Sequence, residues 1–167
     1  IIGVTGTTGK TSTSHNIYNM LNHFNHKCAL IGSSGFKYNN YFKSHLNTTP
    51  NICLLYDYID YCYKKRIKFL CMEISSIAIS ELRCHMIDFY AIVFTNMSED
   101  HLDYHKTIDN YLFNKLIPIY NLSNKAHLIV NKDDFYYKEI IKHTKCIVHT
   151  FSINAKSDYK ALNPVAN

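Results

Sequence analysis

Short apolar runs alternate with helical patterns along most of the chain, and this alternation constrains the fold more than any other feature. The runs that read as strands are 1–5, 28–33, 67–74, 89–96, 126–131 and 145–151. Apolar residues at helical spacing predict helices over 11–24, 51–63, 107–117 and 135–143. Strands that are apolar on both faces and alternate with helices are typical of a mostly parallel sheet flanked by helices. We therefore expect an α/β domain of this kind, with no clear element in the tail from about 153.

Composition and charge place the chain among ordinary globular proteins. It has 167 residues, 47% of them hydrophobic and 19% charged, and no apolar run approaches the ~20 residues that span a bilayer. The net charge of +5 is mild, and the compact basic run 64–66 reads as a solvated helix end. Six cysteines without a CxxC pair indicate a reduced, cytoplasmic setting. We expect neither a membrane nor a nucleic acid as partner. Because the chain begins at Ile1 rather than Met, we expect it to be part of a longer protein.

Polar clusters follow three of the predicted strands. The stretch GTTGKTS (6–12) follows the first strand, Glu73 ends another, and NMSEDH (96–101) follows a third. Ligands of open parallel sheets gather beyond the carboxyl ends of the strands. We therefore expect these three clusters to converge on one site.

The sequence GVTGTTGKTST (3–13) lies between a predicted strand and a predicted helix, where a phosphate-binding loop is found. Gly6 and Gly9 allow backbone N–H groups to point at phosphate oxygens, and the helix N-terminus adds its positive dipole end. Lys10 would reach the β- and γ-phosphates, and the Thr11 hydroxyl would bind Mg²⁺. Val4 occupies the place of the first glycine in the common pattern G-x-x-x-x-G-K-[ST], so this loop is a variant of that pattern.

Other candidate residues have two interpretations each. An ionised Glu73 at the end of an apolar strand needs either Mg²⁺ or a Lys or Arg partner. His101 alone is more typical of a capping or surface histidine than of a ligand, and 103–105 reads mainly as scaffold. Lys115 shares a predicted helix face with apolar residues, and its residue type alone predicts a side chain that extends to water.

The loop Thr5–Thr11 is similar to T-G-T-x-G-K-[ST], which is carried by Mur ligases, folylpolyglutamate synthases and cyanophycin synthetases. Four further stretches narrow the resemblance to the central ATP-binding domain of the MurE type of Mur ligase. They are NTTP (47–50), MEISS (72–76), FTNMSEDHLDYH (94–105) and NYLFNK (110–115). The resemblance covers roughly 1–155. It departs at Ile77, where the family usually has His, and at Glu81, where some relatives have Gln.

The resemblance implies an ATP-dependent amide ligase of peptidoglycan synthesis. A ligase of this type adds a diamino acid to UDP-MurNAc-L-Ala-D-Glu through an acyl phosphate, with ATP and two Mg²⁺ ions. The family also has an N-terminal UDP-binding domain and a C-terminal domain. We expect both to lie outside this chain, so residues 1–167 correspond to the central domain, which we expect to be inactive alone.

The resemblance also implies roles for individual residues. The implied nucleotide-binding residues are Thr5, Gly6, Thr7, Thr8, Gly9, Lys10, Thr11, Ser12 and Asn96. The implied metal ligands are Thr11, Glu73, His101 and Lys115, the last as a carbamate formed with CO₂. The implied catalytic residues are Lys10, Glu73, His101 and carbamylated Lys115. The implied contacts to the UDP-linked substrate are Thr48, Thr49, Ser75, Glu81 and Arg83.

Other functions remain open at this point. A folylpolyglutamate synthase or another Mur ligase would share the loop, although the combination of the other stretches counts against it. A P-loop kinase or GTPase would share Lys10 and Thr11, and NKDD (131–134) matches the letters of a guanine-reading motif. A metal-binding or nucleic-acid-binding module is disfavoured, since the ten histidines are scattered without zinc spacing and no basic–aromatic stripe is present.

Overall fold

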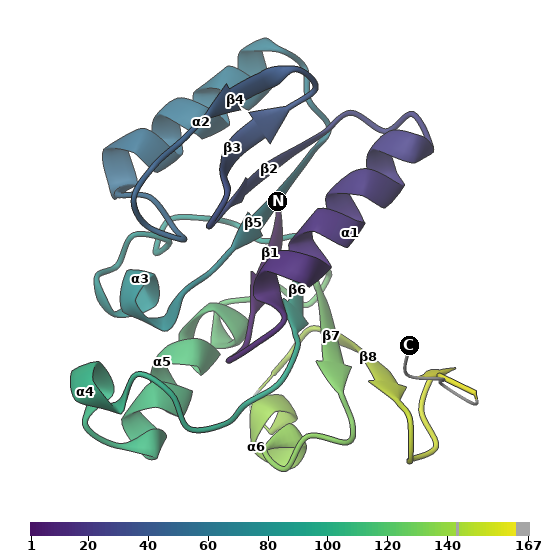
Figure 1. Cartoon of the computed structure of the whole chain (residues 1–167). Coiled ribbons are helices and arrows are strands. Elements are labelled where there is room, and N and C mark those ends of the chain that lie inside the picture. Colours follow the sequence, from purple (N-terminus) through teal and green to yellow (C-terminus); the bar gives the residue numbers. More distant parts are fainter. Residues whose placement is uncertain (143, 163–167) are drawn as a thin grey trace.

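The computed structural model describes residues 1–142 and 144–162, and within these residues the fold is built on one sheet (Figure 1). The strands are β1 Ile2–Thr5, β2 Cys28–Gly32, β3 Gly35–Tyr38, β4 Tyr41–Lys43, β5 Phe69–Glu73, β6 Ala91–Phe94, β7 His127–Asn131, β8 Ile147–Ser152 and β9 Tyr159–Lys160. Their order across the sheet is β4-β3-β2-β5-β1-β6-β7-β8-β9. The β2–β3 and β3–β4 pairs are antiparallel and the others are parallel, which confirms the predicted mostly parallel sheet.

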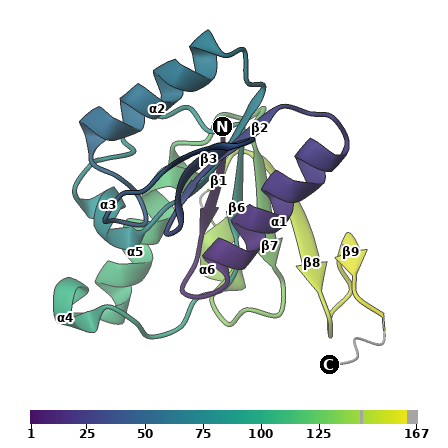
Figure 2. The same cartoon turned by 45° about the horizontal axis from the view of Figure 1, so that its top comes forward.

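Helices cover both faces of the sheet (Figure 2). They are α1 Lys10–His23, α2 Ile52–Lys64, α3 Ser76–Ser80, α4 Leu102–His105, α5 Ile108–Tyr120 and α6 Tyr137–Ile141. On one face, Tyr18 of α1 packs on Val4 and Leu30 in a small apolar cluster. On the opposite face, α2 and α5 contribute Leu55 and Tyr111 to the main core. None of the helices among the described residues is long and apolar enough to cross a membrane.

Several short elements were missing from the sequence-based prediction. The β3–β4 hairpin reverses at Asn39, which has a φ of 50°. Its strands are only three and four residues long and each contains a lysine, so they lack the longer apolar runs that marked the other strands. Helices α3 and α4 are single turns, too short to show a helical period. The expectation of no element in the tail was wrong, because β9 pairs with the end of β8; residues 163–167 lie outside the described residues.

The helix starts differ in how their N–H groups are capped. Asn51, Ser75 and Thr107 each accept a hydrogen bond from the first turn of the helix that follows them. Asn51, and neither Thr48 nor Thr49, is therefore the residue that caps α2. Gly9 precedes α1 and has no side chain to supply such a bond. The first-turn N–H groups of α1 therefore remain available to another acceptor.

The central strands bring the polar clusters together. Strands β5, β1 and β6 are neighbours and parallel, so Thr5, Glu73 and Phe94 end at the same edge of the sheet. The phosphate loop follows the first of these strands and 95–101 follows the last. The predicted convergence of the three clusters is confirmed.

Candidate active site

The loop between β1 and α1 can be built only with glycine at two positions. Gly6 has a φ of 134°, and a Cβ there would lie 2.1 Å from Thr95 Oγ1 and 2.9 Å from the Asn96 carbonyl oxygen. Gly9 has a φ of 79°, a left-handed conformation that L side chains rarely adopt. The loop lines a hollow at the start of α1. The residues that line this hollow are Thr7, Thr8, Gly9, Lys10, Thr11, Ser12, Ser33, Thr48 and Glu73.

Lys10 folds back over the loop. Its Nζ donates to the carbonyl oxygens of Gly6, at 3.0 Å, and Thr7, at 2.7 Å. Burial lowers the pKa of Lys10, while the charge of Glu73 acts in the opposite direction. The ammonium group therefore lies within the hollow and bridges the loop, so it is placed to meet an anion there.

Glu73 carries a fully buried carboxylate at the edge of the same hollow. Its Oε2 accepts from Thr11 Oγ1 at 2.9 Å and from Ser33 Oγ at 3.4 Å, and its Oε1 accepts from the Ser33 N–H at 3.1 Å. A Cβ on Gly32 would lie 2.1 Å from Oε1, so glycine on the adjacent strand leaves the space that the carboxylate occupies. No salt bridge from Lys or Arg to Glu73 occurs among the described residues, so that alternative is not realised.

Hydroxyl and carboxylate oxygens are the donors that Mg²⁺ prefers, together with water and phosphate oxygens. Thr11, Ser33 and Glu73 supply such oxygen ligands, and no sulfur or imidazole lies among them. Within the described part of the chain, no three His, Cys, Asp or Glu side chains are grouped so that they could hold a metal. These oxygen atoms beside the loop therefore fit a hard metal ion that completes its coordination with phosphate and water. They are too few to coordinate the ion without those additional ligands.

Lys115 is buried, which corrects the prediction from its residue type that it would extend to water. Its side chain is 1% exposed, and Nζ donates to the Gly6 carbonyl oxygen at 2.7 Å. The same Nζ lies 4.7 Å from the centre of the Tyr111 ring. Desolvation lowers the pKa of Lys115 to about 7, and the positive charge of Lys10 adds to this effect. A substantial neutral amine fraction is therefore available at neutral pH.

His101 lies at the start of α4 in a left-handed conformation, with a φ of 51°. Its Nε2 is 3.6 Å from Asp100 Oδ2, and its ring meets the Tyr111 ring edge-on at 6.2 Å between centroids. The side chain remains half-exposed. Lys115 and His101 are therefore both neighbours of one buried tyrosine ring.

His105 differs from His101, as the sequence predicted. It is 4% exposed, and its Nε2 lies 2.9 Å from Ser76 Oγ. Tyr104 joins the same two helices through a 2.9 Å contact between its hydroxyl and Ser80 Oγ. Burial lowers the pKa of His105, which favours the neutral ring. These two residues therefore hold α4 against α3.

The residues predicted to contact a UDP-linked substrate form a network beside the hollow. Thr49 is buried, and its Oγ1 donates to the Glu73 carbonyl oxygen at 2.9 Å and accepts from the Ser75 N–H at 3.0 Å. Arg83 donates from Nη1 to the Thr49 carbonyl oxygen at 2.7 Å and from Nε to Glu81 Oε2 at 2.7 Å. Thr48 lies 3.0 Å from Ser33, Oγ1 to Oγ, within the hollow. The structure thus brings these five residues together on the Glu73 side of the loop.

Asn96 and Thr5 contact the loop and its surroundings through hydrogen bonds within the protein. Asn96 Oδ1 accepts from the Thr8 N–H at 3.0 Å, and Thr5 Oγ1 donates to the Ile74 carbonyl oxygen at 3.1 Å. Sequence reasoning missed Ser33 and Tyr111 as site residues. Ser33 directly follows a strand that ends at the same sheet edge, and this position was the signal that could have found it.

We predict that Lys115→Met stabilises the protein at neutral pH. Between about pH 7 and pH 10.5 the folded lysine is neutral while the unfolded one is protonated, so wild-type stability rises with pH. The variant lacks this penalty and should be more stable by about 2 kcal/mol near pH 7, with a margin that shrinks toward pH 10. Urea unfolding across this range measures the margin, with the exposed Lys138→Met as control. A constant margin would contradict the assigned burial.

Comparison with known proteins places the chain in a family. Residues 4–166 match the Mur ligase middle domain. The chain is 36% identical over 171 residues to a Bacillus cereus protein named UDP-N-acetylmuramoyl-L-alanyl-D-glutamate–2,6-diaminopimelate ligase, a match that covers 99% of this chain and 35% of the relative. An Aquifex aeolicus protein of the same name is 36% identical over 163 residues, covering 98% of this chain and 33% of the relative.

Solved structures agree with this assignment. A structure of a ligase of the same name matches 95% of this chain and 33% of its own, with 28% identity and a TM-score of 0.85. MurF from Acinetobacter baumannii matches with a TM-score of 0.67 at 17% identity, covering 90% of this chain and 30% of its own, which shows a shared fold. The chain spans about a third of the length of the curated relatives that it matches. The chain belongs to the Mur ligase family and corresponds to its middle domain.

Proposed function

We propose that this chain is the ATP-binding domain of a MurE-type ligase. The ligase would join a diamino acid, 2,6-diaminopimelate in the named relatives, to UDP-MurNAc-L-Ala-D-Glu. The observation that carries the proposal is the buried Glu73 carboxylate, which accepts from Thr11 at the mouth of a glycine loop. We propose a cytoplasmic location for the enzyme and a need for N- and C-terminal domains to complete the site.

The loop residues would bind and orient ATP. The uncapped N–H groups at the start of α1 and in the loop would donate to phosphate oxygens, and Lys10 would turn from the Gly6 and Thr7 carbonyls to the β- and γ-phosphates. Thr11, Ser33 and Glu73 would hold Mg²⁺, which supplies positive charge against the phosphoryl oxygens. These groups would serve a reaction in which negative charge is concentrated on phosphate.

The proposed reaction has two steps. A substrate carboxylate oxygen bonds to the γ-phosphorus of ATP, and ADP leaves, which yields an acyl phosphate. The amine of the incoming amino acid then bonds to the carbonyl carbon, phosphate leaves, and the amine nitrogen loses a proton. Thr48, Thr49, Ser75, Glu81 and Arg83 would contact the UDP-linked substrate. The Nε and Nη2 fork of Arg83 already pairs with the Glu81 carboxylate, and its Nη1 donates to the Thr49 carbonyl, so a substrate carboxylate or phosphate would replace Glu81 at this fork.

Lys115 would act as a carbamate. Its buried neutral amine would bond to the carbon of CO₂ and release a proton, which turns a cation into an anion beside the loop. With His101, this carbamate would hold a second Mg²⁺. The shared neighbourhood of Lys115 and His101 around Tyr111 supports the pairing.

A guanine-reading role for NKDD is disfavoured. The Asp134 carboxylate accepts from the N–H groups of Met97 and Tyr136, and the Asp133 carboxylate accepts from Ser152 and the Ile153 N–H. Both carboxylates are therefore occupied within the protein. The folylpolyglutamate synthase structures resemble this chain at 12–15% identity, so they bear on the fold alone.

We predict that Lys10→Ala weakens MgATP binding by about a hundredfold, because one charge-assisted contact to the phosphates is lost. Calorimetric titration of the chain with MgATP and MgGTP measures the effect and the preferred base. Lys64→Ala, at an exposed lysine on α2, is the matched control and should bind as wild type does. Unchanged affinity in Lys10→Ala, or a preference for GTP, would refute the assignment of the loop to ATP.

We predict that Gly32→Ala folds but raises the Mg²⁺ concentration needed for half-maximal ATP binding. The added Cβ collides with Glu73 Oε1 and displaces the carboxylate, while the backbone at this position is compatible with alanine. A shift of about tenfold or more is expected, as for residues that orient metal ligands. The measurement is an ATP titration at graded Mg²⁺, with thermal unfolding as the folding control. A wild-type Mg²⁺ requirement would count against Glu73 as ligand.

We predict that ¹³C-labelled bicarbonate gives a carbamate carbon signal in the wild-type chain and none in Lys115→Ala. The low pKa of Lys115 supplies the neutral amine that CO₂ requires. Carbon NMR at neutral pH in the presence of Mg²⁺ detects the adduct without any need for ligase activity. Lys138→Ala serves as the control for other lysines. A carbamate signal that persists in Lys115→Ala would show that another amine is modified.

A further inference from the structure

A support segment, residues 95–98, is bound to the phosphate loop along its length. The Thr7 N–H donates to the Asn96 carbonyl oxygen at 2.9 Å, and the Thr8 N–H donates to Asn96 Oδ1 at 3.0 Å. Thr7 and Ser98 bond to each other twice: Thr7 Oγ1 donates to the Ser98 carbonyl oxygen at 3.1 Å and accepts from the Ser98 N–H at 3.0 Å. The conformation of the loop therefore depends on where this segment lies.

Asp134 holds the middle of the support segment. Its Oδ2 accepts from the Met97 N–H at 2.7 Å, and its Oδ1 accepts from the Tyr136 N–H at 2.8 Å. Met97 lies between Asn96 and Ser98, both of which bind the loop. Asp134 follows β7 and is half-buried. One carboxylate thus fastens the turn after β7 to the segment that carries the loop.

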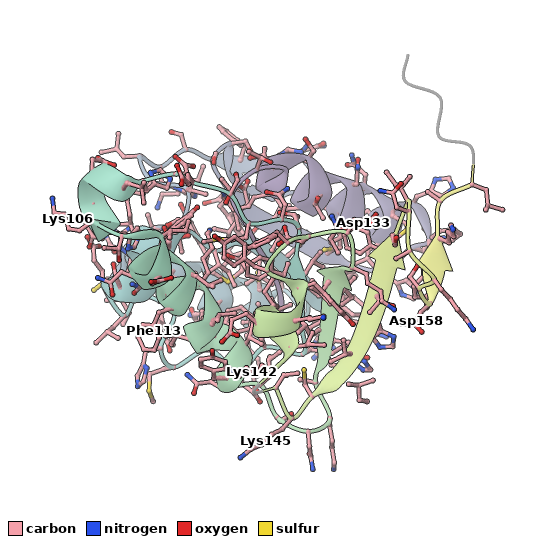
Figure 3. The ribbon with its side chains drawn as sticks, turned by 90° about the horizontal axis from the view of Figure 1, so that it is seen from below. Lys106, Phe113, Asp133, Lys142, Lys145 and Asp158 are labelled. Atoms are coloured by element: carbon pink, nitrogen blue, oxygen red, sulfur yellow. The ribbon has the colours of Figure 1, made fainter. Side chains whose placement is uncertain are left out.

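The neighbouring Asp133 also accepts hydrogen bonds from a distant segment, in this case residues 152–153. Its Oδ1 accepts from Ser152 Oγ at 2.7 Å, and its Oδ2 accepts from the Ile153 N–H at 2.6 Å. Figure 3 shows Asp133 on the side of the molecule that carries β8 and β9. The two adjacent carboxylates of NKDD therefore have separate targets, and only Asp134 acts toward the phosphate loop.

We infer that Asp134 is a positioning residue for nucleotide binding, which rests on the proposed function of the loop. Asp134 does not line the hollow; it acts through Met97 on Asn96 and Ser98, and through these on Thr7 and Thr8. A carboxylate suits this place because both of its oxygens accept N–H groups at once, and hydrogen bonds to a charged acceptor are the stronger ones. An asparagine has one acceptor oxygen and could serve Met97 or Tyr136, but not both.

The first test is hydrogen exchange in Asp134→Asn, with Asp133→Asn as the matched control. Exchange at the Met97, Thr7 and Thr8 amides should rise about tenfold in Asp134→Asn, which corresponds to the loss of one charge-assisted bond. Asp133→Asn should raise exchange only around 152–154. Faster exchange in Asp134→Asn that is confined to 131–137, with the support segment still protected, would overturn the inference.

The second test is a double-mutant cycle on MgATP affinity with Thr7→Val, which removes the hydroxyl that binds Ser98. Each single variant should bind MgATP about five- to tenfold more weakly, and the double variant should lose less than the product, because both changes break one linkage. Losses that multiply, or Asp134→Asn binding as wild type does, would overturn the inference. Absence of MgATP binding by the wild-type protein with its N- and C-terminal domains present would instead refute the proposed function.

Should Asp134→Asn fail to fold, Thr7→Val alone tests the linkage from the loop side. Exchange at the Met97 and Ser98 amides should then rise in that variant. Unchanged exchange at both amides would overturn the linkage between the support segment and the loop.

Discussion

The rest of the site depends on the burial of one carboxylate. Glu73 has no exposed surface, and among the described residues its side chain has hydrogen-bond donors but no cation at contact distance. An ionised carboxylate without water is costly unless donors replace the solvent. Thr11 on α1 and Ser33 after β2 supply those donors, and Gly32 leaves room for the group. Helix α1 and strands β2 and β5 are thereby held around a negative charge that a hard cation can also bind.

The strands and helices that form the centre of the fold could be predicted because each carries a long apolar signal. Every predicted strand and helix has a counterpart in the structure. The missed elements lack that signal, since each is only two to five residues long. Strand β9 depends on tertiary contacts: Asp158 Oδ2 accepts from the Thr150 N–H at 2.8 Å, and so holds the tail beside β8. Local sequence gives no warning of such contacts.

The site could be predicted where it follows from strand ends, and not where it follows from packing. Glu73, Thr11 and the glycine loop converge because their strands are adjacent and parallel. Lys115 was placed in water by its residue type, whereas the approach of α5 to the loop buries its Nζ against the Gly6 carbonyl. Asp134 resembled a guanine-reading residue by its letters, yet its contacts are to backbone N–H groups. Residue type and spacing therefore do not predict which residues become neighbours through tertiary packing.

The two edge strands of the sheet affect how readily the protein aggregates. Among the described residues, the outermost strands are β4, with three residues that include Lys43, and β9, with two that include Lys160. Long unpaired strands invite other chains to add to a sheet, whereas short edges that carry lysine discourage it. The continuous apolar strands of the centre are thus shielded from intermolecular pairing. A fold whose interior consists of strongly β-forming segments can in this way remain resistant to aggregation.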